Sequence, residues 1–410
     1  MEKLKTLFAS DRAFWAGFTI FAGVVAVLKG IRQPSLVAAT QAQLNYDFGL
    51  IRRGLFGTVA QALDIPVHHY EVFALVSYLL LAIYGVVLVH AVRKSALPST
   101  LSGLMICAVF ASSYTTTYTA HLAGRFDIPL MTATLLIATT RDPLLRNAIL
   151  IVVAPLCVLL HEMFFLAFLP VCLLPTVFDL LLKPRTTRVF VGAGAALIAL
   201  GVSAATTLLL ALQHFTATER IAALRSEIES RVDFPLDRTV WGILERGAAE
   251  NVGVMTDWGW HIGTRILSVP FSLILFLPTT AFLLVCVWRI LKADFFPQRA
   301  ALTMAVLSLC VASPLALNLF GADMDRWNAF ILFNSFVALL VVARPGFAPG
   351  ATLPMATTAW SNLAILLVAT NLAAGGGLLD FAQITPWPFR EHGFSLLDLA
   401  REGSLPRPTR

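Results

Sequence analysis

The chain has 410 residues, of which 58% are hydrophobic and 13% are charged. Soluble globular domains carry about 25% charged residues, so this composition excludes a soluble globular protein and predicts a chain solvated mainly by lipid. The net charge of +6 does not indicate a nucleic-acid partner. No segment on the predicted cytoplasmic side is long enough to form a binding domain, and membrane orientation accounts for the basic surplus.

Apolar runs of membrane-spanning length recur along the chain. A helix needs about 20 apolar residues to cross roughly 30 Å of hydrocarbon. The runs are continuous rather than alternating, which favours helices over a β-barrel. We therefore expect an all-α polytopic membrane protein with about 11 transmembrane helices, forming one integral membrane domain over residues 1–410. The expected helices are Phe14–Leu28, Tyr70–Val92, Leu101–Thr119, Ile128–Thr140, Ala148–Leu160, Met163–Leu182, Val189–Leu212, Ile266–Ile290, Ala301–Phe320, Ala329–Val342 and Thr357–Ala374.

The stretch from Arg146 to Lys183 is compatible with one long kinked helix or with a helical hairpin. It is too long for one crossing, and both of its ends are basic, so the chain is expected to return to the side that it left. We favour the hairpin, with its turn at His161-Glu162.

The basic residues of the short loops predict an N-terminus in the cytoplasm. The cytoplasmic segments then hold 14 basic and five acidic residues, and the opposite face holds 16 basic and 19 acidic residues. The first apolar run lacks a small-residue cleavage site and is expected to be a retained helix. Few lysines among many alanines and leucines suggest a bacterium, so we expect an inner-membrane protein with an extracytoplasmic C-terminus.

Three larger segments are expected on the extracytoplasmic side. Residues 29–69 contain two stretches suited to helices in the membrane interface, Ser35–Tyr46 and Ile51–Leu63. Residues 213–264 begin with a charged helical run, Thr218–Arg231, and the tail 375–410 is interrupted by prolines.

The five cysteines all lie inside apolar runs without CxxC spacing. They are expected to be small core residues, and neither a disulfide framework nor a zinc site is predicted. We also find no nucleotide-binding or haem motif. A divalent cation is left open as a cofactor.

The polar clusters among the apolar segments fall almost entirely on the extracytoplasmic side in this topology. This convergence indicates one site lined by carboxylate and guanidinium groups. The clusters are Asn45-Tyr46-Asp47 with Arg52-Arg53, Gly124-Arg125-Phe126-Asp127, His161-Glu162, and Asp323-Met324-Asp325-Arg326.

Arg52 and Arg53 lie in a glycine-spaced stretch on the face that should be poor in positive charge. Arginine matches phosphate oxygens with a planar fork, so a lipid phosphate or pyrophosphate is the expected ligand. Contact with ordinary anionic headgroups, or an ion pair with Asp47, is the alternative.

Asp47 stands beside Tyr46 in the first outside loop. Its carboxylate suits a general base for an acceptor hydroxyl, or a metal ligand. The alternative is an N-cap for a helix that starts near Phe48.

Arg125 and Asp127 lie at a helix–helix turn next to the hydroxyl-rich stretch Tyr114–Tyr118. Asp127 precedes Ile128-Pro129, so capping of the next helix is its default role. Arg125 is the stronger candidate for ligand binding.

His161 and Glu162 interrupt an apolar segment, where ionisable groups usually face a cavity or a partner. An acid/base element or a metal pair competes with a plain hairpin turn. A zinc protease is excluded, because the residue four positions after His161 is Phe165 and no HExxH motif exists.

Asp323 and Asp325 have DxD spacing, which suits one cation or one sugar. A local salt bridge with Arg326 that caps the next helix is an equally good interpretation.

These features together resemble the C-type glycosyltransferase superfamily: multi-pass helices, an acid in the first extracytoplasmic loop, interfacial helices after the first crossing, and further acids and arginines on that face. The resemblance covers the architecture of roughly the first three quarters of the chain. It implies a polyprenyl-phosphate or polyprenyl-pyrophosphate sugar donor as partner, in contact with membrane lipids. It departs from the usual pattern in two ways: Asp47 has no DxD or ExD pattern beside it, and there is no large soluble C-terminal domain, which argues against an oligosaccharyltransferase-like enzyme.

By this resemblance, Asp47 activates the acceptor and an arginine holds the donor phosphate. From the chemistry of the reaction, His161 is expected to help this base. Glu162 is a further catalytic candidate, and the supporting candidates are Tyr46, Asp127, Asp323 and Asp325. The arginines that could hold the phosphate are Arg52, Arg53, Arg125 and Arg326.

Two other functions stay open. An O-antigen-type glycan polymerase or ligase would place its chemistry in the late loop, residues 213–264. A lipid or solute transporter would place ionisable groups deep in broken, repeated helices, whereas most charges here lie at helix ends.

Overall fold

The computed structural model describes residues 12–47, 49–182, 184, 186–212, 218–245, 250, 253, 276–293, 297–319, 324–345 and 357–373. All regular elements in these ranges are helices, as the sequence predicts. They are α2 Arg12–Gly30, α3 Leu36–Ala42, α4 Leu55–Ala62, α5 Tyr70–Lys94, η1 Leu97–Ser99, α6 Leu101–Ser112, α7 Tyr114–His121, α8 Asp127–Thr139, α9 Pro143–Leu160, α10 Phe164–Ala167, α11 Leu169–Leu182, α12 Thr187–Leu212, α13 Thr218–Arg231, α14 Arg238–Glu245, the helix Phe276–Ala293, α17 Pro297–Ala312, η2 Ser313–Leu319, α18 Met324–Val342 and α19 Thr358–Ala373.

Seven helices in the described ranges are long and apolar enough to cross a membrane. Shorter apolar helices, including α6, α8, α18 and α19, accompany them. The helical class is therefore confirmed, and the number of crossings stays a prediction. The seven spans are Arg12–Gly30, Tyr70–Lys94, Pro143–Leu160, Phe164–Leu182, Thr187–Ala211, Phe276–Ala293 and Gln298–Leu319.

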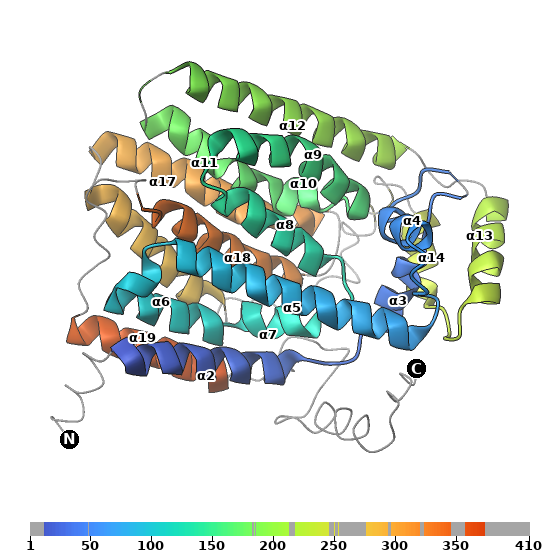
Figure 1. Cartoon of the computed structure of the whole chain (residues 1–410), viewed down its shortest axis with the longest axis horizontal. Coiled ribbons are helices and arrows are strands. Elements are labelled where there is room, and N and C mark those ends of the chain that lie inside the picture. The colour runs from blue at the N-terminus through green and yellow to red at the C-terminus, as the bar shows by residue number, and fades with distance from the viewer. Residues whose placement is uncertain are drawn as a thin grey trace.

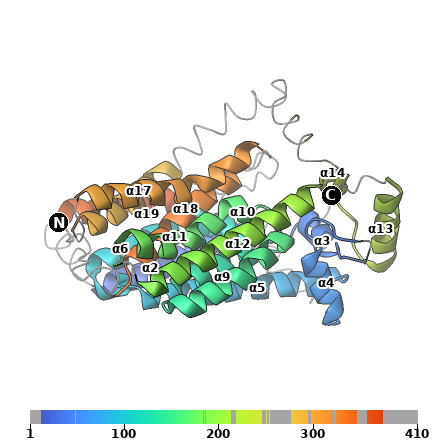
Figure 2. The same cartoon turned by 90° about the horizontal axis from the view of Figure 1, so that it is seen from above.

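The long helices lie alongside one another, and α3, α4, α13 and α14 gather beyond one end of them (Figures 1 and 2). We call this group of four helices the end cap. Helices α3 and α4 lie in the expected stretches Ser35–Tyr46 and Ile51–Leu63, and α13 is the helix expected at Thr218–Arg231. The location of α3 and α4 in the membrane interface stays a prediction. The end cap is thus built from the first loop and the late loop.

Helix α18 forms the centre of the apolar core. Phe330, Phe333 and Phe336 are fully buried. The ring of Phe336 stacks on Phe110 of α6 with centroids 3.8 Å apart, and Phe330 contacts Phe168 at 4.9 Å. A helix that is apolar and covered on all sides is typical of a bundle core. Outer helices such as α12 instead expose large apolar side chains suited to lipid.

The single helix expected at Leu101–Thr119 is in fact two helices, α6 and α7. Ser113 between them has extended backbone, with ψ 158°. The Ser112 hydroxyl donates to the Val109 carbonyl at 2.9 Å and the Thr116 hydroxyl to the Phe110 carbonyl at 3.0 Å. These side chains satisfy carbonyls that a continuous helix would use, which explains the break.

The stretch from Arg146 to Lys183 is a hairpin, as expected. Helix α9 begins at Pro143 behind the capping side chain of Asp142, which accepts from the Leu145 N–H at 2.8 Å. Arg146 of α9 donates to Asp179 of α11 at 3.2 Å. The start of α9 therefore meets the end of α11, so the chain returns to the side that it left.

The cysteines are free, and four of the five are buried, as expected of small core residues. The tail 375–410 and the end of the late loop, residues 254–264, lie outside the described residues, as does the start of the helix expected at Ile266–Ile290.

Candidate functional site

The turn of the α9–α11 hairpin carries the centre of the candidate site. Helix α9 ends at Leu160, and His161 has extended backbone, with φ −161° and ψ 120°. This change of direction lets the His161–Met163 turn lie between two spans, outside both of them. The His161 Nδ1 accepts from the Met163 N–H at 3.3 Å and lies 3.4 Å from Oε2 of Glu162.

Burial lowers the pKa of His161 to about 4, and the Arg53 guanidinium acts in the same direction against the Glu162 carboxylate. The imidazole is therefore neutral near pH 7. Burial acts to raise the pKa of Glu162, but Arg53 and His161 outweigh burial and hold this pKa well below its ordinary value. The turn thus presents a neutral imidazole beside a carboxylate.

Arg53 pairs with Glu162 through one edge of its guanidinium group. Its Nη2 donates to Oε1 at 2.8 Å, and its Nε donates to Oε2 at 3.4 Å. Arg53 has φ +63°, a conformation rare for residues other than glycine. Such an outlier persists only where its surroundings hold it. The loop before α4 therefore fixes the point from which this guanidinium reaches the hairpin turn.

A second ion pair joins Arg326, in the first turn of α18, to Asp127, the first residue of α8. The Nη2 and Nε atoms of Arg326 donate to one oxygen, Oδ1, at 2.6 and 3.0 Å. Asp127 is fully buried, and its Oδ2 is buried without a hydrogen-bond partner. Arg326 Nη2 also lies 3.4 Å from the sulfur of Met163.

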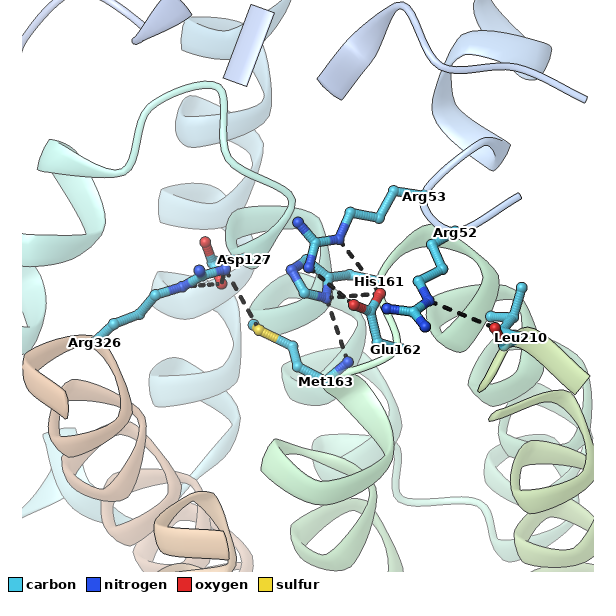
Figure 3. Close-up of polar contacts among 8 residues, drawn as sticks. All are labelled: Arg52, Arg53, Asp127, His161, Glu162, Met163, Leu210 and Arg326. Atoms are coloured by element: carbon cyan, nitrogen blue, oxygen red, sulfur yellow. Dashed lines mark hydrogen bonds and ion pairs between the residues drawn. The ribbon is translucent and has the colours of Figure 1, made fainter. Parts of the chain in front are cut away.

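These contacts form one continuous chain of residues, which we call the arginine–carboxylate network: Arg53, Glu162, His161, Met163, Arg326 and Asp127 (Figure 3). Its members come from the first loop, α8, the hairpin turn and α18. The ring of Phe56 in α4 packs 5.6 Å from that of Phe126, beside Asp127. The first loop is therefore anchored at two points on this end of the bundle.

Arg52 and Arg125 also make contacts near this turn. The Nε of Arg52 donates to the Leu210 carbonyl at 3.5 Å, in the last turn of α12 (Figure 3). A cation is favourable there because carbonyls at a helix C-terminus carry partial negative charge. Arg125 is half-buried in the turn before α8, and its N–H donates to the Leu122 carbonyl at 2.8 Å.

Asp47 belongs to a separate polar group in the first loop. Its Oδ2 accepts from the Asn45 amide at 2.7 Å and from the Gln61 amide at 3.2 Å. The two amides also contact each other at 3.1 Å. Asp47 is exposed, so the amides orient a carboxylate that solvent or a ligand can reach.

Tyr46 packs against the glycine that follows the two arginines. A Cβ on Gly54 would lie 2.5 Å from the Tyr46 ring, so the loop requires glycine there. Burial raises the pKa of Tyr46 to about 12, which keeps its hydroxyl neutral. Tyr46 therefore supports the loop that carries Arg53.

The structure decides several alternatives. Asp127 binds Arg326, and it is the first residue of α8, whose N-cap is Phe126. Asp47 caps no helix there, because α4 begins only at Leu55. Arg53 pairs with Glu162, whereas an ion pair with Asp47 was the alternative.

Asp323 lies outside the described residues, and of Asp325 only the backbone in α18 is described. The DxD interpretation therefore stays a prediction. Within the described part of the chain, no group of three or more His, Cys, Asp and Glu residues could hold a metal ion.

Sequence reasoning missed three participants. Gln61 was detectable as an amide in an otherwise apolar expected interfacial helix. The contact of Met163 with Arg326 and the carbonyl of Leu210 carry no local sequence signal, because both depend on the packing of distant helices.

The chain matches no protein-family model, no curated protein and no solved structure.

Proposed function

We propose that the chain is a glycosyltransferase that moves a sugar from a polyprenyl-phosphate or polyprenyl-pyrophosphate donor to a lipid, glycan or protein acceptor. We place the reaction at the extracytoplasmic face of a bacterial inner membrane, with α3 and α4 in the interface. The observation that carries the proposal is the arginine–carboxylate network. It holds two guanidinium groups, Arg53 and Arg326, at one end of apolar helices.

This location suits an amphiphilic anion. Guanidinium groups bind phosphate oxygens with paired hydrogen bonds. The outer helices beside the network expose apolar side chains to lipid, where a prenyl chain gains roughly 0.8 kcal/mol for each buried CH₂ group. A free sugar or amino acid would use only part of this surface.

The reaction forms a bond between the acceptor oxygen and the anomeric carbon of the sugar and breaks the bond from that carbon to the donor phosphate. The electron pair of the broken bond stays on the phosphate oxygen, so the leaving group needs charge stabilisation more than a proton. Arg53 and Arg326 supply this positive charge, and Asp127 positions Arg326. Arg52, beside the last turn of α12, is placed to bind a second phosphate.

Asp47 takes the proton from the acceptor hydroxyl. Its two amide partners fix one carboxylate oxygen, and the group is exposed to an incoming acceptor. His161 is neutral and is suited to hydrogen bonding with the donor sugar or phosphate.

The late loop is the place where a glycan polymerase or ligase would bind its substrate. Two of its arginines are paired within the exposed helix α13: Arg225 with Glu229 at 2.8 Å and Arg231 with Glu227 at 3.4 Å. These pairs are typical of a solvated helix face, which favours the network as the site.

Arg53→Ala is expected to lower the rate of sugar transfer roughly 100-fold, because the loss of one preorganised donor to a developing oxyanion has an effect of this size. The measurement is transfer from a polyprenyl-linked sugar in proteoliposomes. Arg225→Ala is the matched control, since it removes an arginine from an exposed pair on the same side. If Arg53→Ala kept full activity, the arginine–carboxylate network would not be the site of sugar transfer.

A further inference from the structure

We infer that Glu162 is an exchangeable counterion of Arg53, and that a phosphate group binds by taking the place of this carboxylate on the guanidinium. The inference rests on the proposed function, which puts a phosphate at Arg53. It adds a specific subsite and names the residue that a ligand must displace.

The geometry of the pair imitates a bound phosphate. Both carboxylate oxygens of Glu162 face Arg53, one at 2.8 Å from Nη2 and the other at 3.4 Å from Nε. A phosphate group presents two oxygens to the same guanidinium edge. Carboxylate and phosphate therefore compete for one set of donors.

Exposure separates this pair from the other network pair. The Glu162 side chain is 28% exposed, whereas that of Asp127 is 0% exposed. Displacing Asp127 would leave a charge buried without a partner, which is strongly unfavourable. Glu162 can instead move into solvent at the rim, so it is the carboxylate that exchanges.

The Arg53 guanidinium is held in a fixed position. The backbone of Arg53 is held in a left-handed conformation, and the next residue, Gly54, is packed against the Tyr46 ring. The Arg53 side chain is only 12% exposed. A ligand therefore meets a fixed cation, which lowers the entropy lost on binding.

His161 does not hold Glu162 in place when the carboxylate leaves Arg53. The Nδ1 of His161 lies 3.4 Å from Oε2 of Glu162, but Nδ1 of the neutral imidazole accepts from the Met163 N–H and has no proton to donate. The displaced carboxylate can therefore turn toward solvent. The charged groups around this position are Arg53 from the first loop and Arg326 with Asp127 from α18 and α8.

The exchange makes the site selective for anionic ligands. A neutral headgroup that replaced the carboxylate would leave the charge of Arg53 poorly compensated. A phosphate group replaces the carboxylate and compensates this charge. Glu162 therefore disfavours the binding of uncharged ligands, because such a ligand would have to break the Arg53–Glu162 ion pair without replacing its negative charge.

The test is the dissociation constant of farnesyl phosphate for the full-length protein in detergent, with farnesol and inorganic phosphate as separate probes. Glu162→Gln is expected to bind farnesyl phosphate roughly tenfold more tightly than wild type, because removing a charge-assisted competitor contributes about 1.4 kcal/mol. Asp179→Asn is the matched control. It neutralises a carboxylate paired with a buried arginine, Arg146, at the opposite end of the hairpin, and its affinity should equal that of wild type.

The double variant Arg53→Ala/Glu162→Gln should lose the gain in affinity for farnesyl phosphate that Glu162→Gln shows. Glu162→Ala provides a second route to the same result if the glutamine variant folds poorly. Inorganic phosphate that binds as tightly as farnesyl phosphate, while also tightening in Glu162→Gln, would assign the subsite to free phosphate and support the exchange.

Two outcomes would overturn the inference in different ways. Unchanged or weaker binding by Glu162→Gln and Glu162→Ala, with Arg53→Ala still weakening the wild type, would refute the exchange and leave the proposed function standing. Equal binding of farnesol and farnesyl phosphate, with no effect of Arg53→Ala, would refute both the exchange and the proposed function.

Discussion

Asp127→Ala is expected to destabilise the folded protein by about 3–5 kcal/mol, because it leaves the buried guanidinium of Arg326 without its counterion. Arg326 places two donors on Asp127 Oδ1, and both side chains are buried. The remaining charge would face Met163 and the neutral His161. The measurement is the unfolding free energy in a denaturant titration followed by tryptophan fluorescence.

The double variant Asp127→Leu/Arg326→Met separates a buried-charge effect from general damage to α8. It removes both charges and fills similar volume, so it should recover most of the lost stability. We expect its rate of sugar transfer to be roughly 100-fold below that of wild type, because it lacks one phosphate-binding guanidinium. A double variant as unstable as Asp127→Ala would show that the pair is not the cause.

Asp47→Asn is expected to lower the rate of sugar transfer by about 100- to 10,000-fold, which is the range for removing a general base. The Asn45 and Gln61 amides hold Asp47 from one side, so asparagine keeps the shape of the loop and loses the proton acceptor. Binding of the donor phosphate should be unchanged, because Arg53 and Arg326 are untouched. The measurement is the turnover rate beside the donor dissociation constant.

Asp64→Asn is the control for this prediction. Asp64 is an exposed carboxylate in the same segment, and its φ of +53° is one that asparagine adopts readily. It should transfer sugar at the wild-type rate. If Asp47→Asn kept full turnover as well, the base would have to be sought among other groups on this face.

The sequence predicted the helical class well, because long continuous apolar runs leave few alternatives for a chain in lipid. It also indicated the hairpin, since the basic residues at its two ends require the chain to return. The break at Ser113 was missed. It depends on hydroxyl groups bonding to carbonyls of the preceding turn, and serine and threonine also occur in unbroken helices.

For the candidate site, the sequence indicated most of the residues but not how they pair. Composition and the predicted topology indicated its arginines, carboxylates and histidine, because such groups are few among the apolar segments of this chain, whereas Met163 was missed. The pairing was not predictable. Asp127 and Arg326 are 199 residues apart, and the local arrangement before Pro129 pointed to helix capping. A local rule was overridden here by a distant counterion, and only packing of α8 beside α18 could reveal it.

Asp47 illustrates a second limit. Sequence reasoning placed it with Arg53 because the two are close in the chain. In the structure the loop turns through Gly49, with φ +104°, and through Arg53 itself. The carboxylate then meets the amides of Asn45 and Gln61, while the guanidinium reaches the hairpin turn. Proximity in the sequence therefore did not place the two side chains in one group of contacts.

The most direct test of the account is mass spectrometry of the lipids that co-purify with the protein from membranes of its expression host. Wild type is compared with Arg52→Ala/Arg53→Ala. The account predicts a polyprenyl phosphate or pyrophosphate in wild type that is lost in the double variant, and any attached sugar would identify the donor. Absence of polyprenyl lipids from both proteins, or equal amounts in both, would contradict phosphate recognition by the first loop and favour a transporter.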